Sequence, residues 1–141
     1  MRLAFDADVL IYAAQTIHVY GPDIRALLEN PNLDGLRSGS FLLLPELLSK
    51  PSRLGWQAEL DALTDILATL ELTPMDAPVA ALAAQFGAVY KLKAPEATHL
   101  ASAVSVGADA FITNNLRDFN PALILELRVV FPADLGFLPK C

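Results

Sequence analysis

The sequence predicts an α/β domain built on a parallel β-sheet, because short apolar runs alternate with segments whose apolar residues recur at helical spacing. The run at residues 41–44 is apolar throughout, which suits a strand that helices cover on both faces. With 141 residues, 54% of them hydrophobic, the chain has the length and the apolar content of a single domain. We therefore expect one domain over residues 1–141, with four to five parallel strands.

Each element follows from a local pattern. The predicted strands lie at residues 3–5, 41–44, 70–73, 108–113 and 128–131. The predicted helices lie at residues 7–14, 23–29, 45–48, 54–70, 77–90 and 96–106. Asp76 suits the start of a helix and Gly107 the end of one. Residues 31–40 are expected to form a connection, and residues 132–141 a loose tail.

Composition limits the cellular location of the protein and the partners that it can bind. No apolar run reaches the roughly 18 residues of a membrane span, and Asp6 and Asp8 interrupt the region where a signal peptide would be apolar. The single Cys141 excludes an intrachain disulfide. We expect a soluble, cytoplasmic protein that does not bind membranes. The high apolar content also indicates contact with another chain, as a homodimer or with a partner peptide.

The net charge of −6 argues against broad, charge-driven binding to nucleic acid. Half of the ten basic residues nevertheless stand beside candidate acidic site residues, and these five are Lys50, Arg53, Lys91, Lys93 and Arg117. They are either counter-charges at a site or ordinary solvated side chains. Bound divalent cations would also reduce the negative charge at such a site.

Polar residues stand at the ends of three predicted strands. Asp6 closes the first strand, Glu46 follows the second, and residues 113–115 end the strand at 108–113. Ligands bind beyond the carboxyl ends of parallel strands, and Glu96 joins this group from the first turn of a helix. Clustered carboxylates repel one another unless a cation balances them. Oxygen ligands without Cys predict Mg²⁺ or Mn²⁺, which can activate water and hold a scissile phosphate.

Four segments together resemble PIN-domain ribonucleases, particularly the VapC-type toxins. The segments are FDADVLI at 5–11, LLLPELLSK at 42–50, LKAPEATHLASA at 92–103 and GADAFITNNLRDF at 107–119. The resemblance extends from residue 3 to about residue 131. It implies a three-layer α/β/α sandwich and a Mg²⁺- or Mn²⁺-dependent endoribonuclease that hydrolyses RNA phosphodiester bonds. It also implies a frequent homodimer whose toxin members are inhibited by a cognate antitoxin.

The resemblance assigns roles residue by residue. Glu96 stands where the family usually has Asp, and Asn115 where it often has Asp, so Asp118 is expected to supply the missing carboxylate. Thr113 matches a hydroxyl that supports the acids. The implied catalytic residues are Asp6, Glu46, Glu96 and Asp118, and the implied metal ligands are the same four with Asn115.

Each of these residues also has a purely structural interpretation. Asp6 could cap the first helix, Glu46 and Glu96 could be first-turn acids, and Asn115 and Asp118 could be turn residues. We interpret Asp8 as stabilising a helix start and His99 as a packing histidine, rather than as ligands. The structural interpretations explain single residues but not their common end of the sheet.

Two other functions compete with the nuclease. Asp6 and Asp8 after an apolar strand also resemble the Asp-x-Asp pair of haloacid-dehalogenase-type phosphatases. That family needs a later Lys, and Lys140 after Thr113 leaves no room for the remaining strand. The second alternative is a PIN-like module that binds RNA or protein without cutting, which the departures at Glu96 and Asn115 would allow.

Overall fold

A computed structural model describes residues 1–138 and places five strands in one parallel sheet. The strands are β1 (Leu3–Phe5), β2 (Arg37–Ser40), β3 (Glu71–Thr73), β4 (Ala110–Ile112) and β5 (Arg128–Val130), in the order β3-β2-β1-β4-β5. Every neighbouring pair is parallel. The predicted α/β class and the parallel sheet are therefore confirmed.

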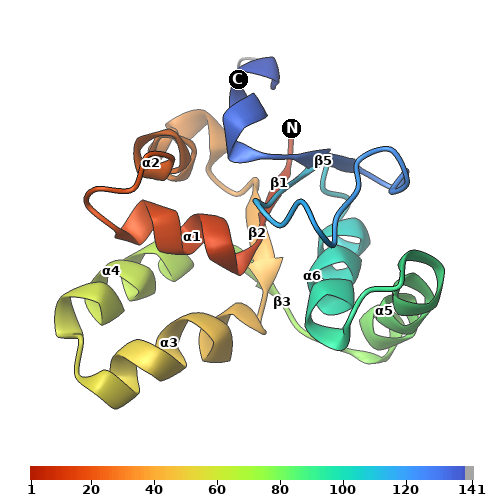
Figure 1. Cartoon of the computed structure of the whole chain (residues 1–141), viewed down its shortest axis with the longest axis horizontal. Coiled ribbons are helices and arrows are strands. Elements are labelled where there is room, and N and C mark those ends of the chain that lie inside the picture. Colours follow the sequence, from red (N-terminus) through yellow and green to blue (C-terminus); the bar gives the residue numbers. More distant parts are fainter. Residues whose placement is uncertain (139–141) are drawn as a thin grey trace.

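Helices cover both faces of the sheet, which gives the three predicted layers (Figure 1). The helices are α1 (Ala7–Ala14), α2 (Gly21–Glu29), α3 (Leu43–Leu54), α4 (Gln57–Ala68), α5 (Ala77–Tyr90) and α6 (Ala94–Ser105). Leu3 and Phe5 of β1 pack in the core cluster shared with α1 to α4, whereas Ala4 packs in the cluster shared with α5 and α6. This alternation follows from the period of two residues in a strand.

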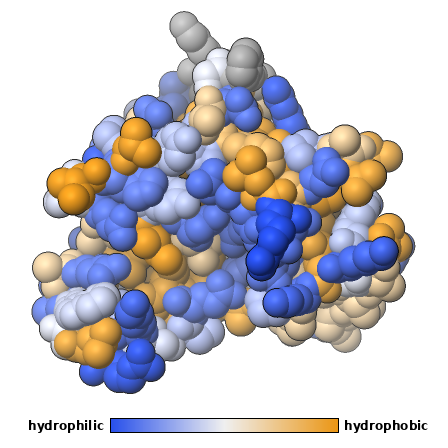
Figure 2. All heavy atoms as spheres, viewed as in Figure 1, coloured by the Kyte–Doolittle hydropathy of each residue, from blue (hydrophilic) through white to orange (hydrophobic). Residues whose placement is uncertain are grey.

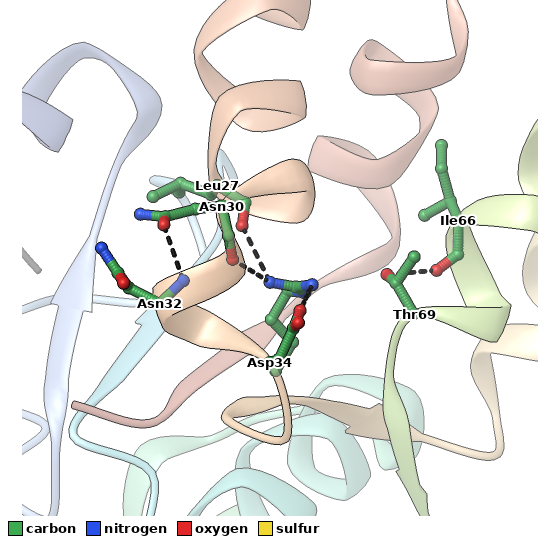
Figure 3. A network of polar contacts seen from close by, with 7 residues as sticks. Leu27, Asn30, Asn32, Asp34, Ile66 and Thr69 are labelled. Atoms are coloured by element: carbon green, nitrogen blue, oxygen red, sulfur yellow. Dashed lines mark hydrogen bonds and ion pairs between the residues drawn. The ribbon is translucent and has the colours of Figure 1, made fainter.

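The predicted strand at 41–44 is wrong. The strand is Arg37–Ser40, inside the predicted connection, and residues 41–44 form a turn and the first residues of α3. The sequence RSGS does not predict a buried strand, because burial of its polar side chains depends on hydrogen bonds that form only in the fold. The Arg37 guanidinium donates to the carbonyls of Leu27 and Asn30 and to the Asp34 carboxylate (Figure 3).

Two further positions of β2 also have reasons for burial. The Ser38 hydroxyl donates to the Leu3 carbonyl at 3.1 Å and so ties β2 to β1. A Cβ at Gly39 would lie 2.5 Å from Cδ1 of Leu43, so glycine at this position allows α3 to pack closely on the strand. These contacts depend on the tertiary fold, and an apolar pattern does not predict them.

Several helix boundaries and the tail also differ from the prediction. The helix predicted at 45–48 continues to Leu54, with Pro51 inside it, and Gly55 ends it at φ +68°. The next helix therefore starts at Gln57 instead of residue 54. The segment Pro132–Phe137 forms a 3₁₀ helix rather than a loose tail. The rest of the predicted tail, with Lys140 and Cys141, lies outside the described residues.

Within residues 1–138, no helix is both long enough and apolar enough to cross a membrane.

Candidate active site

Asp6 and Thr113 form a buried pair at the carboxyl ends of β1 and β4. Phe5 pairs with Ile112 in the sheet register, so the next residue of each strand leaves the sheet at the same place. Asp6 is 8% exposed and Thr113 is fully buried. One carboxylate oxygen of Asp6 accepts the Ala7 backbone N–H at 2.8 Å, and the other accepts the Thr113 hydroxyl at 2.7 Å. Asp6 therefore caps α1 and also occupies the predicted strand end.

Asp8 links the first turn of α1 to the loop after β4. Its Oδ1 accepts the Val9 N–H at 2.7 Å, and its Oδ2 accepts the Asn114 N–H at 2.9 Å. Burial and the negative charge of Asp6 raise the pKa of Asp8 to about 6, although the two N–H donors and His99 oppose this shift. The helix-start interpretation thus accounts for only one of the two oxygens of Asp8.

Glu46 and His99 form the second contact, between α3 and α6, in which the Glu46 side chain is 31% exposed. The Nε2 atom of His99 lies 2.9 Å from Oε1 of Glu46, and the His99 side chain is 3% exposed. Burial lowers the pKa of His99, but the hydrogen bond to Glu46 and the charges of Asp6, Glu46 and Glu96 outweigh it and hold the pKa above its ordinary value. Three predicted acids, from three separate elements, thus act on one imidazole.

Glu96 brings an unpaired oxygen to this region from the first turn of α6. Its Oε2 atom is buried and has no hydrogen-bond partner among the described residues. A buried oxygen without a partner costs free energy, so such atoms in native proteins usually face water, an ion or a ligand. The orphaned oxygen therefore supports a missing partner beside Glu96.

Asn115 and Asp118 are arranged differently, because they bond mainly to each other. Oδ2 of Asp118 accepts the Asn115 side-chain amide at 2.9 Å, and Oδ1 of Asn115 accepts the Asp118 N–H at 3.2 Å. The Asn115 N–H donates to the Thr113 hydroxyl oxygen at 3.1 Å. In the described contacts, Asp118 thus reaches Asp6 only through Asn115 and Thr113. Arg117 lies 3.7 Å from the other oxygen of Asp118.

The described residues fit a divalent cation only in part. Within residues 1–138, no three His, Cys, Asp or Glu side chains gather closely enough to hold one ion together. Mg²⁺ needs fewer protein ligands, because it keeps several waters and is commonly held by one or two carboxylates. The orphaned oxygen of Glu96 and the remaining lone pairs of Asp6 supply that chemistry.

Two of the basic residues noted in the sequence have defined surroundings. The Lys50 ammonium lies 5.3 Å from the centroid of the Trp56 ring, a cation–π contact. The Arg117 side chain is 84% exposed beside Asp118. Lys50 therefore contacts an aromatic ring on the α3–α4 connection, whereas Arg117 is largely exposed and paired with Asp118.

Comparison with known protein families identifies the fold. The sequence matches the PIN domain over residues 3–120. The chain belongs to the PIN domain family. PIN domains are generally nucleases, and they typically use divalent metal ions. This membership favours the PIN interpretation over the phosphatase that the Asp-x-Asp pair suggested.

Solved structures agree with this PIN domain assignment at the level of the fold. A chain of a toxin-antitoxin complex from Klebsiella pneumoniae is 23% identical with a TM-score of 0.72, and the match covers 94% of this chain and 98% of that one. A chain of DNA-bound VapBC from Salmonella typhimurium is 20% identical, with a TM-score of 0.73 and coverage of 94% and 98%.

A third similar structure is VapBC2 from Rickettsia felis bound to a promoter DNA fragment. Its matching chain is 17% identical, with a TM-score of 0.70 and coverage of 93% of this chain and 98% of that one. No curated protein matches the sequence. The PIN domain therefore rests on the family match and on a fold shared over nearly the whole chain.

Proposed function

We propose that this PIN domain is an endoribonuclease that hydrolyses RNA phosphodiester bonds with Mg²⁺ or Mn²⁺. The observation that carries the proposal is the group of acids around the buried His99, which we call the acidic group. Asp6, Glu46 and Glu96 come from the end of β1, from α3 and from α6, and the charge of each raises the pKa of that one imidazole. Separate helix-cap roles explain each acid but do not require that they meet.

The metal would be held chiefly by Asp6 and Glu96, with Glu46 completing the acidic group. When bound, the cation supplies an activated water and neutralises charge on the phosphate. The Thr113 hydroxyl fixes one oxygen of Asp6, and His99 fixes one oxygen of Glu46. These contacts orient the acids in the same way that outer-shell hydrogen bonds orient metal ligands.

Asn115 and Asp118 would take a lesser part in the metal site. Their mutual hydrogen bonds occupy the Asn115 amide and one Asp118 oxygen, and the Asn115 N–H holds the hydroxyl oxygen of Thr113. Asp118 would thus add negative charge beside the acidic group while the hydrogen bonds of the 115–118 turn are kept. A role as a further ligand, directly or through water, uses the lone pairs that these bonds leave.

We further propose a cytoplasmic toxin that forms a homodimer and is inhibited by an antitoxin. The three similar structures are named as toxin-antitoxin or VapBC complexes, which supports an antitoxin partner here. Exposed apolar side chains support contact with other chains, since they gain free energy when covered. The most exposed are Ile17 at 95%, Leu125 at 82% and Val19 at 77%.

One observation favours a second candidate, a PIN-like module that binds RNA or protein without cutting. Asn115 adds no charge, and Asp118 is engaged by Asn115 and lies beside Arg117. A site with fewer free carboxylates would hold a cation less tightly. Metal uptake without RNA cleavage, unchanged by Asp6→Asn, would identify this module.

The nuclease is tested with purified protein, a mixed-sequence RNA and Mn²⁺. Asp6→Asn and Glu46→Gln should each reduce cleavage by about a hundredfold or more, because each removes a charge from the acidic group. Asp65→Asn and Glu29→Gln make the same chemical changes at exposed positions and should leave cleavage unchanged. EDTA should stop the reaction. Cleavage that survives EDTA, or that survives both site variants, contradicts the proposal.

A further inference from the structure

Three aromatic side chains, Tyr12, His18 and Tyr20, form a partly exposed group that we call the aromatic cluster. The rings of Tyr12 and His18 stack with centroids 3.8 Å apart and planes 4° from parallel. The plane of the Tyr20 ring is tilted by 41° from both, and its centroid lies 6.2 Å from that of Tyr12 and 5.8 Å from that of His18. The Tyr12–His18 pair therefore shows the near-parallel arrangement that nucleic-acid bases also adopt when they stack, with the tilted Tyr20 ring beside it.

The aromatic cluster is linked to Asp8 through Asn114. Tyr12 is four residues after Asp8 on α1, about 6 Å along the helix axis. The Asn114 side-chain amide donates to the Tyr12 hydroxyl at 3.0 Å, and the Asn114 backbone N–H donates to Asp8. The cluster is thus connected through one residue of the loop after β4 to Asp8, which lies two residues after Asp6.

His18 is held in place on a projecting connection. The Tyr20 backbone N–H donates to Nδ1 of His18 at 3.1 Å, which fixes the imidazole against Tyr12. The neighbouring side chains of Ile17 and Val19 are 95% and 77% exposed. Figure 2 shows hydrophobic atoms at the edge of the face where this α1–α2 connection lies, beside a mainly hydrophilic centre. The ordered rings can bind a ligand with little loss of conformational entropy.

We propose that the aromatic cluster is a stacking site for an unpaired RNA base next to the scissile phosphate. The proposal rests on the proposed nuclease function and names the form of its substrate, single-stranded RNA. Aromatic rings hold unpaired bases by stacking, which contributes about 1–3 kcal/mol per base and does not require positive charge. That independence matters here, because a chain with a net charge of −6 has little general attraction for phosphate.

The binding test uses single-stranded RNA that carries the fluorescent base 2-aminopurine, in EDTA so that metal-dependent cleavage does not occur. The wild-type protein should quench the probe when the fluorescent base occupies the cluster. His18→Leu and Tyr20→Leu should abolish that quenching and weaken RNA binding about 5- to 150-fold, the range that corresponds to one lost stacking contact. His18→Phe and Tyr20→Phe keep a ring and should retain both signals.

A matched control separates this site from aromatic surface in general. Trp56 is 45% exposed on the α3–α4 connection, and Trp56→Leu should change neither quenching nor affinity. In cleavage assays the His18→Leu and Tyr20→Leu variants should raise KM more than they lower kcat. Thermal unfolding of each variant verifies that the fold is intact.

The two proposals fail in different ways. Unchanged RNA affinity and quenching in the Leu variants overturn the stacking site, even if the wild-type protein cleaves RNA. The same result would mean that the cluster stabilises the α1–α2 connection or contacts another protein. Quenching that depends on His18 and Tyr20 in a protein that cleaves nothing supports the stacking site and overturns the nuclease. Absence of RNA binding by wild-type protein overturns the stacking site.

Discussion

The acids predicted from the sequence fall into two regions that are held together differently. Two members of the acidic group are held by contacts between distant parts of the chain. Thr113 contacts Asp6 across 107 residues, and His99 contacts Glu46 across 53. The 115–118 turn is closed by contacts across three residues. Local turn chemistry is sufficient to explain the turn, whereas only the tertiary fold assembles the acidic group. We infer from this difference that the acidic group, rather than the turn, is the functional site.

The largest effect on stability is expected from pH, through the raised pKa values of Asp8 and His99. Burial and Asp6 raise the folded-state pKa of Asp8 from 3.8 to about 6, so folding stabilises its protonated form. The associated stability is complete below about pH 4 and is lost as the pH rises through 6, an effect of about 3 kcal/mol at most. The raised pKa of His99 acts in the same direction, because its contribution is complete below 6.5 and is lost above its folded pKa.

Urea unfolding in EDTA measures this pH dependence. The free energy of unfolding of the metal-free protein should fall between about pH 4 and pH 7, and Asp8→Asn should flatten the curve. Asp118→Asn serves as the control from the turn and should leave the slope unchanged. Equal slopes for the wild-type protein and Asp8→Asn would contradict the raised pKa of Asp8 that burial and Asp6 produce.

The next effect concerns the positioning of Glu46. Replacing His99 by Leu removes the partner of Oε1 in Glu46, and we expect Mn²⁺ affinity to fall about 10- to 100-fold. His99→Gln keeps a donor and should recover part of that loss, which a change in packing alone would not produce. Calorimetric Mn²⁺ titration of the three proteins provides the measurement. Unchanged affinity in His99→Leu contradicts the positioning role.

A smaller effect is expected at Thr113. Thr113→Val keeps the side-chain shape but leaves Oδ2 of the buried Asp6 without its 2.7 Å hydrogen bond. The variant should lose about 2 kcal/mol of stability, since an unpaired buried acceptor carries that desolvation cost. Thr64→Val is a control at an exposed position on α4. Denaturant unfolding at neutral pH compares the two, and equal losses would contradict a special role for Thr113.

Much of the fold was predictable because local signals agreed with the tertiary structure. The apolar run before Asp6 is a strand, and Asp76 caps α5, as expected. Residues after neighbouring parallel strands share one edge of the sheet, which is why the Asp6–Thr113 pairing follows from two separate segments. The C-terminal end of α6 was equally predictable, because Gly107 follows that helix and adopts φ +70°.

The remaining features depend on contacts that a single sequence does not show. β2 consists of Arg37 and three small residues, and its burial depends on hydrogen bonds that the Arg37 guanidinium and the Ser38 hydroxyl make to other segments. The residue that orients Glu46 is His99, 53 positions later, so the sequence favoured a simple packing role for it. The helical spacing of His99 three residues after Glu96 was the available signal, and only the fold connects it to α3.

Mn²⁺ titration of the metal-free protein tests most directly whether the acidic group, rather than the 115–118 turn, holds the ion. The decisive comparison is Glu96→Gln, which alters the oxygen that lacks a protein partner, with Asp118→Asn, which alters the turn. We predict that Glu96→Gln weakens Mn²⁺ binding by about a hundredfold and Asp118→Asn by less than about tenfold. A greater loss in Asp118→Asn, or no Mn²⁺ binding by the wild-type protein, would contradict this account.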